Sequence, residues 1–257
     1  MIVPDLTFQF YEKVVQMYEE VLFDLKKLSL MGQIKAVGSG ANSVGKTMQN
    51  ALNIPHTTNA KNQYKGWTIT STTLKSGSRT NLFALVPDWK NSFIKSSTEL
   101  VNKYGIQDNT GKYERKLFCT VKSDTPNSFG LMLKLSRNTG ELFEVHRTED
   151  EDTILCRWDA KKIEQKLKRL DKSIIVTASQ HKKEDGIYYH YQFAEFMSKP
   201  QPIKFLQQIE FGSITLDHLI SIKHNHATAR EQGPLFKIAK HARADLYETY
   251  HKYNLMG

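Results

Sequence analysis

Residues 6–30 carry apolar side chains at the spacing of an α-helix, and the charged residues among them fall largely on the opposite face. The apolar positions are Phe8, Tyr11, Val14, Val15, Tyr18, Val21, Leu22, Leu25 and Leu28. This period predicts an amphipathic helix, or two short ones. Further helices are predicted over residues 43–52, 93–104, 160–170, 203–209 and 241–253. Ser43 and Asp159 are the expected N-caps of two of these helices, and Gly105 closes another.

Alternating or continuous apolar runs predict strands between the helices. They lie at residues 67–73, 81–86, 116–121, 130–135, 142–146, 153–158, 173–178, 188–193, 213–222 and 235–238. Residues 76–78 form the expected turn between the first two strands, and residues 223–232 form a polar loop. Nothing repeats, and no low-complexity linker divides the chain. The pattern predicts a mixed α/β protein with a large sheet component.

Composition narrows the class of protein and of partner. The chain has 257 residues, 39% of them hydrophobic, a net charge of +9 and a pI of about 9.3. This length fits one large domain or two lobes that share a core. The charge favours a polyanionic partner such as nucleic acid, with solubility alone as the alternative.

Cysteine usage and the N-terminal sequence bear on the compartment. Cys119 and Cys156 lie in apolar runs, which predicts buried thiols in a reducing compartment rather than a disulfide. No signal peptide is recognisable, and no apolar run approaches the ~20 residues of a membrane span. We therefore expect a cytoplasmic protein.

The sequence from Gly38 to Pro87 is basic and contains no acidic residue; none occurs between Asp24 and Asp88. Within it, Val44-Gly45-Lys46-Thr47 suggests a phosphate-binding loop. No buried strand precedes this sequence, so that interpretation is rejected.

The order of the elements resembles the MvaI/BcnI restriction-endonuclease family, which is itself similar to the mismatch-repair nicking enzyme MutH. The resemblance covers roughly residues 30–250. The stretches that carry it are residues 44–49, 66–70 with 81–85, 153–178 continuing to 188–191, and 217–238. It implies an α/β (α+β) fold of the restriction-endonuclease, PD-(D/E)xK type, with a mixed sheet flanked by helices. It also implies one domain over residues 1–257, with a catalytic lobe at roughly 30–125 and a recognition lobe at 126–257 around a DNA cleft.

Members of the family are monomeric, magnesium-dependent enzymes that cleave a short DNA site. Carried over by position, the family's helix glutamate falls on Gln49 and its aspartate on Gln63, or on Asn62 if the gap shifts. The strand glutamate falls on Thr68 and the lysine on Thr70. All these residues are neutral, whereas a hard divalent ion needs carboxylate oxygens. We therefore expect no intact catalytic residue, no metal site and no cofactor, with magnesium required only if the chain is active.

Nearby cationic and polar residues are the candidate DNA contacts: Lys46, Lys61, Lys65, Lys75, Arg79 and Asn81. Scattered solvated lysines are the alternative interpretation. The resemblance places the family's base-reading His-Asp-x-Gly loop on Arg230, Glu231 and Gln232, where arginine can pair with guanine and glutamate with cytosine.

The roles of three charged motifs remain open. His224 and His226 form a His-x-His pair that suggests metal binding, DNA contact or an unliganded loop. The acidic run at residues 149–152 suggests a cation site or a solvated loop, and the basic helix at 160–170 suggests phosphate contact or packing on the sheet exterior.

Three functions follow as hypotheses. The first is sequence- or modification-specific binding of double-stranded DNA by a catalytically degenerate homologue. It would act within a restriction or defence system, as a monomer or as a hetero-oligomer with a second protein subunit. The second is an active magnesium-dependent type II endonuclease that uses acids from elsewhere, such as Asp88, Glu99 or Asp217. The third is a protein-interaction subunit with a basic docking face.

Overall fold

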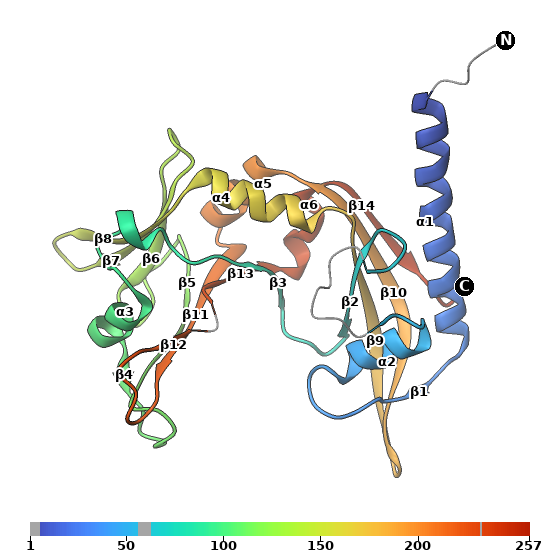
Figure 1. Cartoon of the computed structure of the whole chain (residues 1–257), viewed down its shortest axis with the longest axis horizontal. Helices are drawn as coiled ribbons and strands as arrows, with labels where there is room; N and C mark the ends of the chain where they lie inside the picture. The colour runs from blue at the N-terminus through green and yellow to red at the C-terminus, as the bar shows by residue number, and fades with distance from the viewer. Residues whose placement is uncertain (1–5, 56–62, 232) are drawn as a thin grey trace. The chain divides into compact units, whose positions relative to one another are not determined.

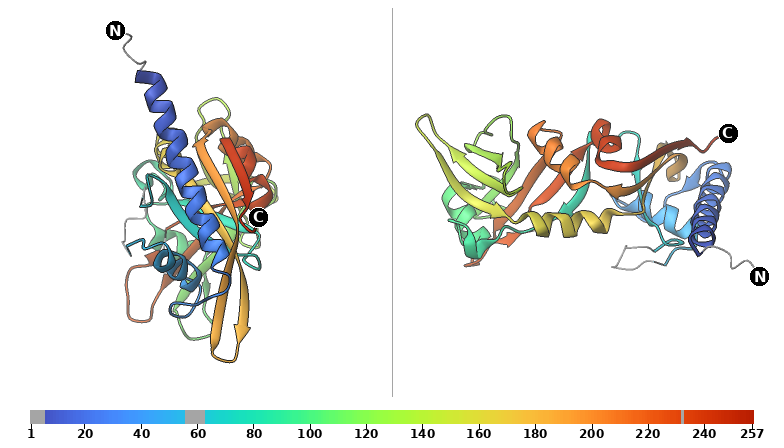
Figure 2. Two further views of the ribbon diagram at one scale, coloured as in Figure 1. Left: turned by 90° about the vertical axis from the view of Figure 1, so that its right-hand side faces the viewer. Right: turned by 90° about the horizontal axis from the view of Figure 1, so that it is seen from above.

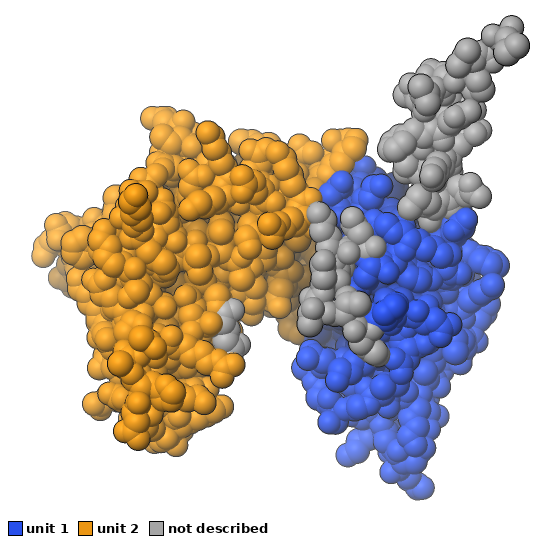
Figure 3. All heavy atoms as spheres, viewed as in Figure 1, with its two compact units in different colours: residues 1–76, 171–198, 249–257 blue, residues 77–170, 199–248 orange. Residues whose placement is uncertain are grey.

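The computed structural model describes residues 6–55, 63–231 and 233–257, and the chain forms two compact units (Figure 3). Unit 1 comprises residues 1–76, 171–198 and 249–257, and unit 2 comprises residues 77–170 and 199–248. Each unit is therefore assembled from separate parts of the chain. These parts do not coincide with the continuous segments 30–125 and 126–257 expected for the two lobes.

Unit 1 is built on a sheet of strand order β1–β10–β9–β2, with β14 also paired to β10 (Figure 1). The bounds are β1 Ile34–Lys35, β2 Thr68–Thr73, β9 Ser173–Lys183, β10 Gly186–Pro200 and β14 Tyr247–Asn254. Strands β9 and β10 form an antiparallel hairpin, whereas β2 runs parallel to β9. Helices α1 (Leu6–Leu30) and α2 (Ser43–Ala51) pack on this sheet, and Figure 2 shows α1 lying along it.

The core of unit 1 lies between these helices and the sheet. Val21, Leu25 and Leu28 from α1 are buried, as their helical spacing predicts. Phe196 of β10 is almost fully buried and forms an aromatic cluster with Tyr18, Trp67 and Tyr253. The Phe196 ring centroid lies 4.7 Å from that of Tyr18, 5.3 Å from that of Trp67 and 5.7 Å from that of Tyr253.

Unit 2 contains two sheets. One has the order β3–β13–β11–β5–β4, with β12 paired to β11, and the other has the order β6–β7–β8. The strand bounds are β3 Arg79–Ala84, β4 Ile106–Gln107, β5 Arg115–Val121, β6 Leu131–Leu135, β7 Leu142–Arg147, β8 Asp152–Trp158, β11 Ile214–Ile222, β12 Arg230–Glu231 and β13 Leu235–Ala239. The helices are α3 Ser97–Tyr104, α4 Ala160–Leu167, α5 Pro202–Glu210 and α6 Arg243–Leu246, with 3-10 turns η1 Trp89–Asn91, η2 Lys168–Leu170 and η3 Lys240–Ala242.

Most of the predicted elements are present. Residues 6–30 form one helix, and the Asp159 side chain caps α4 by accepting a hydrogen bond from the Lys162 amide. Both cysteines are free thiols, Cys156 buried and Cys119 half-buried. In the part of the chain that is described, no helix is long and apolar enough to cross a membrane.

The prediction of a final helix over residues 241–253 is wrong. Only Arg243–Leu246 is helical, and Tyr247–Asn254 forms β14. Tyrosines at 247, 250 and 253 are good strand formers, and Tyr253 packs against Phe196 when β14 pairs with β10. Burial of the aromatic ring in the sheet thus overrides the helical period.

Three local predictions also need correction. The strands on either side of residues 76–78 do not form a hairpin, because β2 pairs with β9 whereas β3 pairs with β13. The helix predicted at 93–104 begins only at Ser97, where Ser96 supplies the N-cap. Ser43 is not a cap either: Asn42 is the N-cap residue of α2, and the Ser43 hydroxyl donates to the Gly40 carbonyl oxygen at 2.7 Å.

Replacing Phe196 by alanine is expected to destabilise the protein by about 3–5 kcal/mol, because it leaves a cavity among three aromatic rings. Chemical denaturation followed by tryptophan fluorescence measures this, since Trp67 lies in the cluster. Phe211→Ala is the matched control: Phe211 is 74% exposed, so its loss should change stability by less than about 0.5 kcal/mol. Equal effects of the two substitutions would contradict this core assignment.

Candidate functional site

The family resemblance makes β2 the expected catalytic strand. It is the last strand in the order of its sheet, so one of its edges is open. The amide N–H of Thr68 donates to the Lys172 carbonyl oxygen at 2.8 Å, so Thr68 bonds toward β9. In a parallel ladder alternate residues bond to the same neighbour, so the carbonyl group of Ile69 faces the unpaired edge. The Gln63 side chain covers it, with Nε2 donating to the Ile69 oxygen at 2.9 Å.

Of the four positions expected for the catalytic residues, Thr68 and Thr70 belong to β2 itself, Gln63 contacts its edge, and Gln49 lies on α2. Thr68 and Thr70 lie on one face of β2, because Ile69 between them is buried in the core. Thr70 is exposed, and its hydroxyl donates a long bond, 3.4 Å, to the Ile174 carbonyl oxygen. Gln49 is half-buried on α2. The structure thus brings Gln63 directly against β2.

The donor atoms at these positions do not fit a divalent metal ion. They are amides and hydroxyls, which carry no negative charge to balance a dication. The Gln63 amide N–H group already occupies the Ile69 carbonyl oxygen, which faces the open edge between Thr68 and Thr70. Within residues 6–55, 63–231 and 233–257, no group of three or more His, Cys, Asp or Glu side chains is placed to hold a metal ion.

A cavity of about 460 Å³ lies at the other end of β2, and its lining includes the hydroxyl residues Ser71, Thr72 and Thr73. It adjoins Gly40, which stands five residues before Gly45-Lys46-Thr47, the spacing of a phosphate-binding loop. The structure does not form such a loop. Helix α2 begins before the motif's second glycine, at Ser43, and the Thr47 hydroxyl is held by the Ser43 carbonyl oxygen (2.7 Å) and the Val37 amide (2.8 Å).

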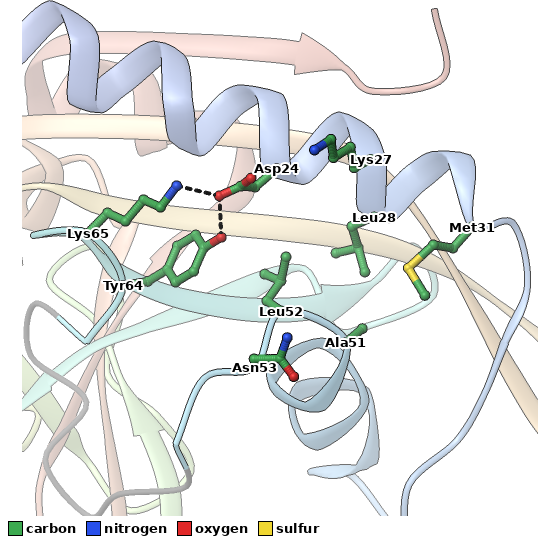
Figure 4. A pocket seen from close by; sticks show the side chains of 9 residues that line it. All are labelled: Asp24, Lys27, Leu28, Met31, Ala51, Leu52, Asn53, Tyr64 and Lys65. Carbon is green, nitrogen blue, oxygen red and sulfur yellow. Dashed lines mark hydrogen bonds and ion pairs between the residues drawn. The ribbon is translucent and has the colours of Figure 1, made fainter.

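The charge of Lys65 is neutralised within unit 1. Its Nζ lies 2.7 Å from Asp24 and 3.6 Å from Glu20, and the Tyr64 hydroxyl donates to the same Asp24 oxygen at 2.6 Å (Figure 4). Burial alone would raise the pKa of Asp24, but the bonds from Lys65 and Tyr64 outweigh it and lower the pKa. The bond to Asp24 correspondingly raises the pKa of Lys65. Asp24, Tyr64 and Lys65 line a cavity of about 360 Å³ between α1, the end of α2 and residues 64–65.

The other predicted contacts in unit 1 are more open. Lys46 and Lys75 are exposed, and neither side chain has a partner among the described residues. Lys61 lies outside the described residues, as does the alternative position Asn62.

Asp217 is the centre of an ion network in unit 2. The guanidinium group of Arg79 holds both of its carboxylate oxygens, at 2.6 Å and 3.2 Å, and Lys237 Nζ lies 2.7 Å from Oδ2. Arg79 also donates to the hydroxyls of Thr215 and Thr120 at 2.6 Å and 3.2 Å. Burial acts to raise the pKa of Asp217, but Lys237 and Arg79 lower it. Arg79 is therefore fixed in place, and Asp217 is already neutralised.

The other two acids proposed as relocated ligands also have local roles. Asp88 accepts a hydrogen bond from the Asn91 side chain at 2.8 Å, and Glu99 accepts one from the Lys95 amide at 2.7 Å. Asn81 is exposed on β3, opposite Lys237 of β13.

The predicted base-reading loop contains both an exposed and an inward-turned charged side chain. Arg230 is exposed, whereas the Glu231 carboxyl is turned inward, with one oxygen buried and without a partner in the described parts of the chain. Burial raises the pKa of Glu231, against the lowering effect of His218 and of a bond from Ser97. The Ala229 amide donates to the Thr98 hydroxyl at 2.9 Å, which fixes the loop on the start of α3. Gln232 lies outside the described residues.

The two histidines of the same loop are exposed. His224 Nε2 lies 3.2 Å from the Gly111 carbonyl oxygen, and Asn225 between the histidines has a left-handed φ of 62°. His226 is exposed as well. The pair therefore forms part of a surface turn.

A buried His–Glu pair was not identified from the sequence. His218 of β11 and Glu144 of β7 are both fully buried, and His218 Nε2 lies 2.9 Å and 3.0 Å from the two Glu144 oxygens. Burial acts to lower the pKa of His218, but Glu144 outweighs it, and Glu231 and Asp217 add to the increase. A histidine in the middle of a predicted strand is the signal that could have marked it. The pair links the two sheets of unit 2.

The fold and the edge strand define a restriction-endonuclease-like protein, and comparison with known proteins agrees. The family model described as the MvaI/BcnI restriction endonuclease family matches residues 22–247, so the chain belongs to this family.

Solved structures of similar fold are those of restriction endonuclease MvaI. The complex of MvaI with its cognate DNA substrate has a TM-score of 0.74 at 17% identity, covering 92% of this chain and 97% of that one. MvaI in the absence of DNA has a TM-score of 0.57 at 18% identity, covering 90% and 95%. No curated protein sequence gives a significant match. The expected fold class is confirmed.

The His218–Glu144 pair predicts how stability depends on pH. Because the pKa of folded His218 is raised, its stabilising contribution is fully present below the ordinary histidine pKa of about 6.5 and is lost as pH rises through the folded value. The free energy of unfolding should therefore fall above neutral pH. Denaturant titrations from pH 6 to 9 measure it, and an NMR titration of the His218 ring checks the assignment.

The controls for this prediction are two substitutions. His226→Asn, in the exposed turn, should leave the pH dependence unchanged, whereas Glu144→Gln should abolish most of it. If Glu144→Gln does not fold, the NMR titration of the unmodified protein decides alone. A ring pKa at or below the ordinary value would refute the prediction.

Proposed function

We propose that this protein binds double-stranded DNA through a restriction-endonuclease fold without cutting it. Membership of the MvaI/BcnI family supports a DNA-related function, and the relative MvaI has been solved in complex with its cognate DNA. The net charge of +9 supports an electrostatic contribution to such binding. Of this charge, +6 belongs to unit 2, which carries 24 basic and 18 acidic residues.

The observation that carries the proposal is the neutral character of the β2 edge. Metal-assisted hydrolysis of a phosphodiester needs carboxylates that hold the ion and lower the pKa of the attacking water. Gln49, Gln63, Thr68 and Thr70 supply no negative charge, and the Gln63 amide bonds the Ile69 carbonyl oxygen. No divalent-ion cofactor is therefore part of the proposal.

The free cations and polar groups are the expected DNA contacts. Lys46 and Lys75 in unit 1 and Arg230 in unit 2 are exposed, and Asn81, His224 and His226 are exposed polar groups. Lys65 is less suited because its charge is paired with Asp24, and Glu231 because its carboxyl is turned inward. Arg230 is then the candidate for direct base reading, through the guanine edge in the major groove.

The two alternatives have less support. An active endonuclease with relocated acids would need Asp88, Glu99 or Asp217 as metal ligands, and each is already engaged locally, Asp217 by two cations. A protein-interaction subunit would use the same basic surface without nucleic acid. Among the residues that the structure describes in the two units, nothing specifically favours a protein partner.

The test of the proposed function is binding and cleavage measured side by side. Duplex oligonucleotides are expected to bind with an affinity that falls steeply with salt, with a log–log slope of about −3 or steeper. Supercoiled plasmid incubated with magnesium or manganese should remain intact. Linear or nicked products from pure protein would refute the non-cutting proposal, and absence of duplex binding at low salt would refute DNA binding.

Restoring charge at the β2 edge provides a second prediction. The variant Gln63→Asp/Thr68→Glu/Thr70→Lys is expected to gain manganese binding and a melting temperature that rises with manganese, because clustered carboxylates repel each other until a dication binds. Calorimetric titration measures binding. The matched control Gln63→Asn/Thr68→Gln/Thr70→Lys has side chains of the same size without the carboxylates and should not gain manganese binding. Manganese binding near β2 by the unmodified protein would contradict the interpretation.

A further inference from the structure

A third cavity, of about 430 Å³, lies at one end of the larger sheet of unit 2, and its lining includes cationic and hydroxyl side chains. Three basic residues face it: Arg79 at the start of β3, Lys122 directly after β5, and His241 in η3. Ser78 and Ser213 add hydroxyls from the segments before β3 and β11. These groups come from separate parts of the chain and meet only because β3, β13, β11 and β5 are neighbours in one sheet.

The donors in this cavity are largely unused. The side chains of Lys122, His241, Ser78 and Ser213 have no hydrogen-bond or ion-pair partner among the residues that the structure describes. Arg79 is held rigidly, since its two Nη groups bond Thr215, Asp217 and Thr120, which leaves Nε for a ligand. Preorganised donors lose little entropy when a ligand binds.

The charge of the cavity is positive. None of the described residues that line it is acidic. Asp217, which lies behind Arg79, is balanced by Arg79 and Lys237 together, so this group of three retains one positive charge. The Asp124 carboxylate is the acid near the rim, with its oxygens 3.5 Å and 3.7 Å from where a side chain on Gly212 would begin. Gly212 has a φ of +68° and forms the turn that presents Ser213.

From this arrangement we propose that the cavity binds a phosphate group. A tetrahedral anion offers several acceptor oxygens in different directions, which matches an ammonium group, an imidazole and two hydroxyls that converge from different elements. The phosphate is either a backbone phosphodiester of DNA, which rests on the proposed function, or a free phosphate. Both share the same recognition chemistry. Lys122 and His241 are then the residues that hold the anion, and the Arg79–Asp217 pair is the rigid wall behind it.

The experiment uses the whole protein, inorganic phosphate and a DNA duplex as separate probes. The variants are Lys122→Ala and His241→Ala, both at exposed positions, with exposed Lys204→Ala on α5 as the matched loss of one charge elsewhere in unit 2. Phosphate is titrated into labelled protein and followed by amide NMR. Changes in amide chemical shift are expected at Lys122, Ser213 and His241 in the unmodified protein and in Lys204→Ala. These changes should be lost in Lys122→Ala and in His241→Ala.

The duplex titration distinguishes the two sources of phosphate. If the cavity holds a DNA phosphodiester, Lys122→Ala should weaken duplex binding by about tenfold and reduce the salt slope by about 1 more than Lys204→Ala does. If duplex binding is unaffected while the phosphate shifts are lost, the cavity binds free phosphate and the proposal stands in that form.

Failure of this inference can be told apart from failure of the proposed function. A protein that binds no duplex but shows the expected phosphate shifts refutes the DNA function and supports the cavity. Absence of phosphate shifts, or shifts that persist unchanged in both Lys122→Ala and His241→Ala, overturns the inference whether or not duplex DNA binds.

Discussion

The hydrogen bond from the Gln63 amide to the Ile69 carbonyl oxygen is the interaction on which the functional interpretation depends. It satisfies a backbone oxygen on the unpaired edge of β2, a group that costs free energy when it is left without a partner. In a metal-dependent nuclease that region would carry carboxylates and a cation. A neutral amide fills it here without charge, so the edge is stable without an ion.

The cations of the protein differ in whether their charge is available to a ligand. Lys65 and Arg79 look like DNA contacts in the sequence, but each is bonded to an aspartate of the protein. Lys122 and His241 attract no attention in the sequence, yet their side chains stand free at a cavity. A cation that is already paired adds little to the attraction of a polyanion, whereas an unpaired one adds its full charge. Net charge therefore favours a class of partner without locating the surface that binds it.

Unit 2 shows how buried charge is tolerated. Asp217 is surrounded by Arg79, Lys237 and hydroxyl donors, and His218 is paired with Glu144 in full burial. Burying an isolated charge is costly, so each acid in these strands requires partners from neighbouring strands. These pairs connect strands that are far apart in the chain. The reading loop is affected as well, because Glu231 is drawn inward toward His218 and Ser97 while Arg230 remains at the surface.

The sequence by itself determined the element order that places the chain in the MvaI/BcnI family, and it determined the lack of any acid between Asp24 and Asp88. Both are properties of local pattern and composition, which do not depend on packing. It did not determine that residues 247–254 form a strand, that β2 and β3 belong to different sheets, or which cations are paired. Only the tertiary structure decided these, because strand pairing, burial of Tyr253 against Phe196 and the bond between Arg79 and Asp217 join residues distant in the chain. Such contacts leave no periodic signal in the sequence, since each is fixed by partners that come together only on folding.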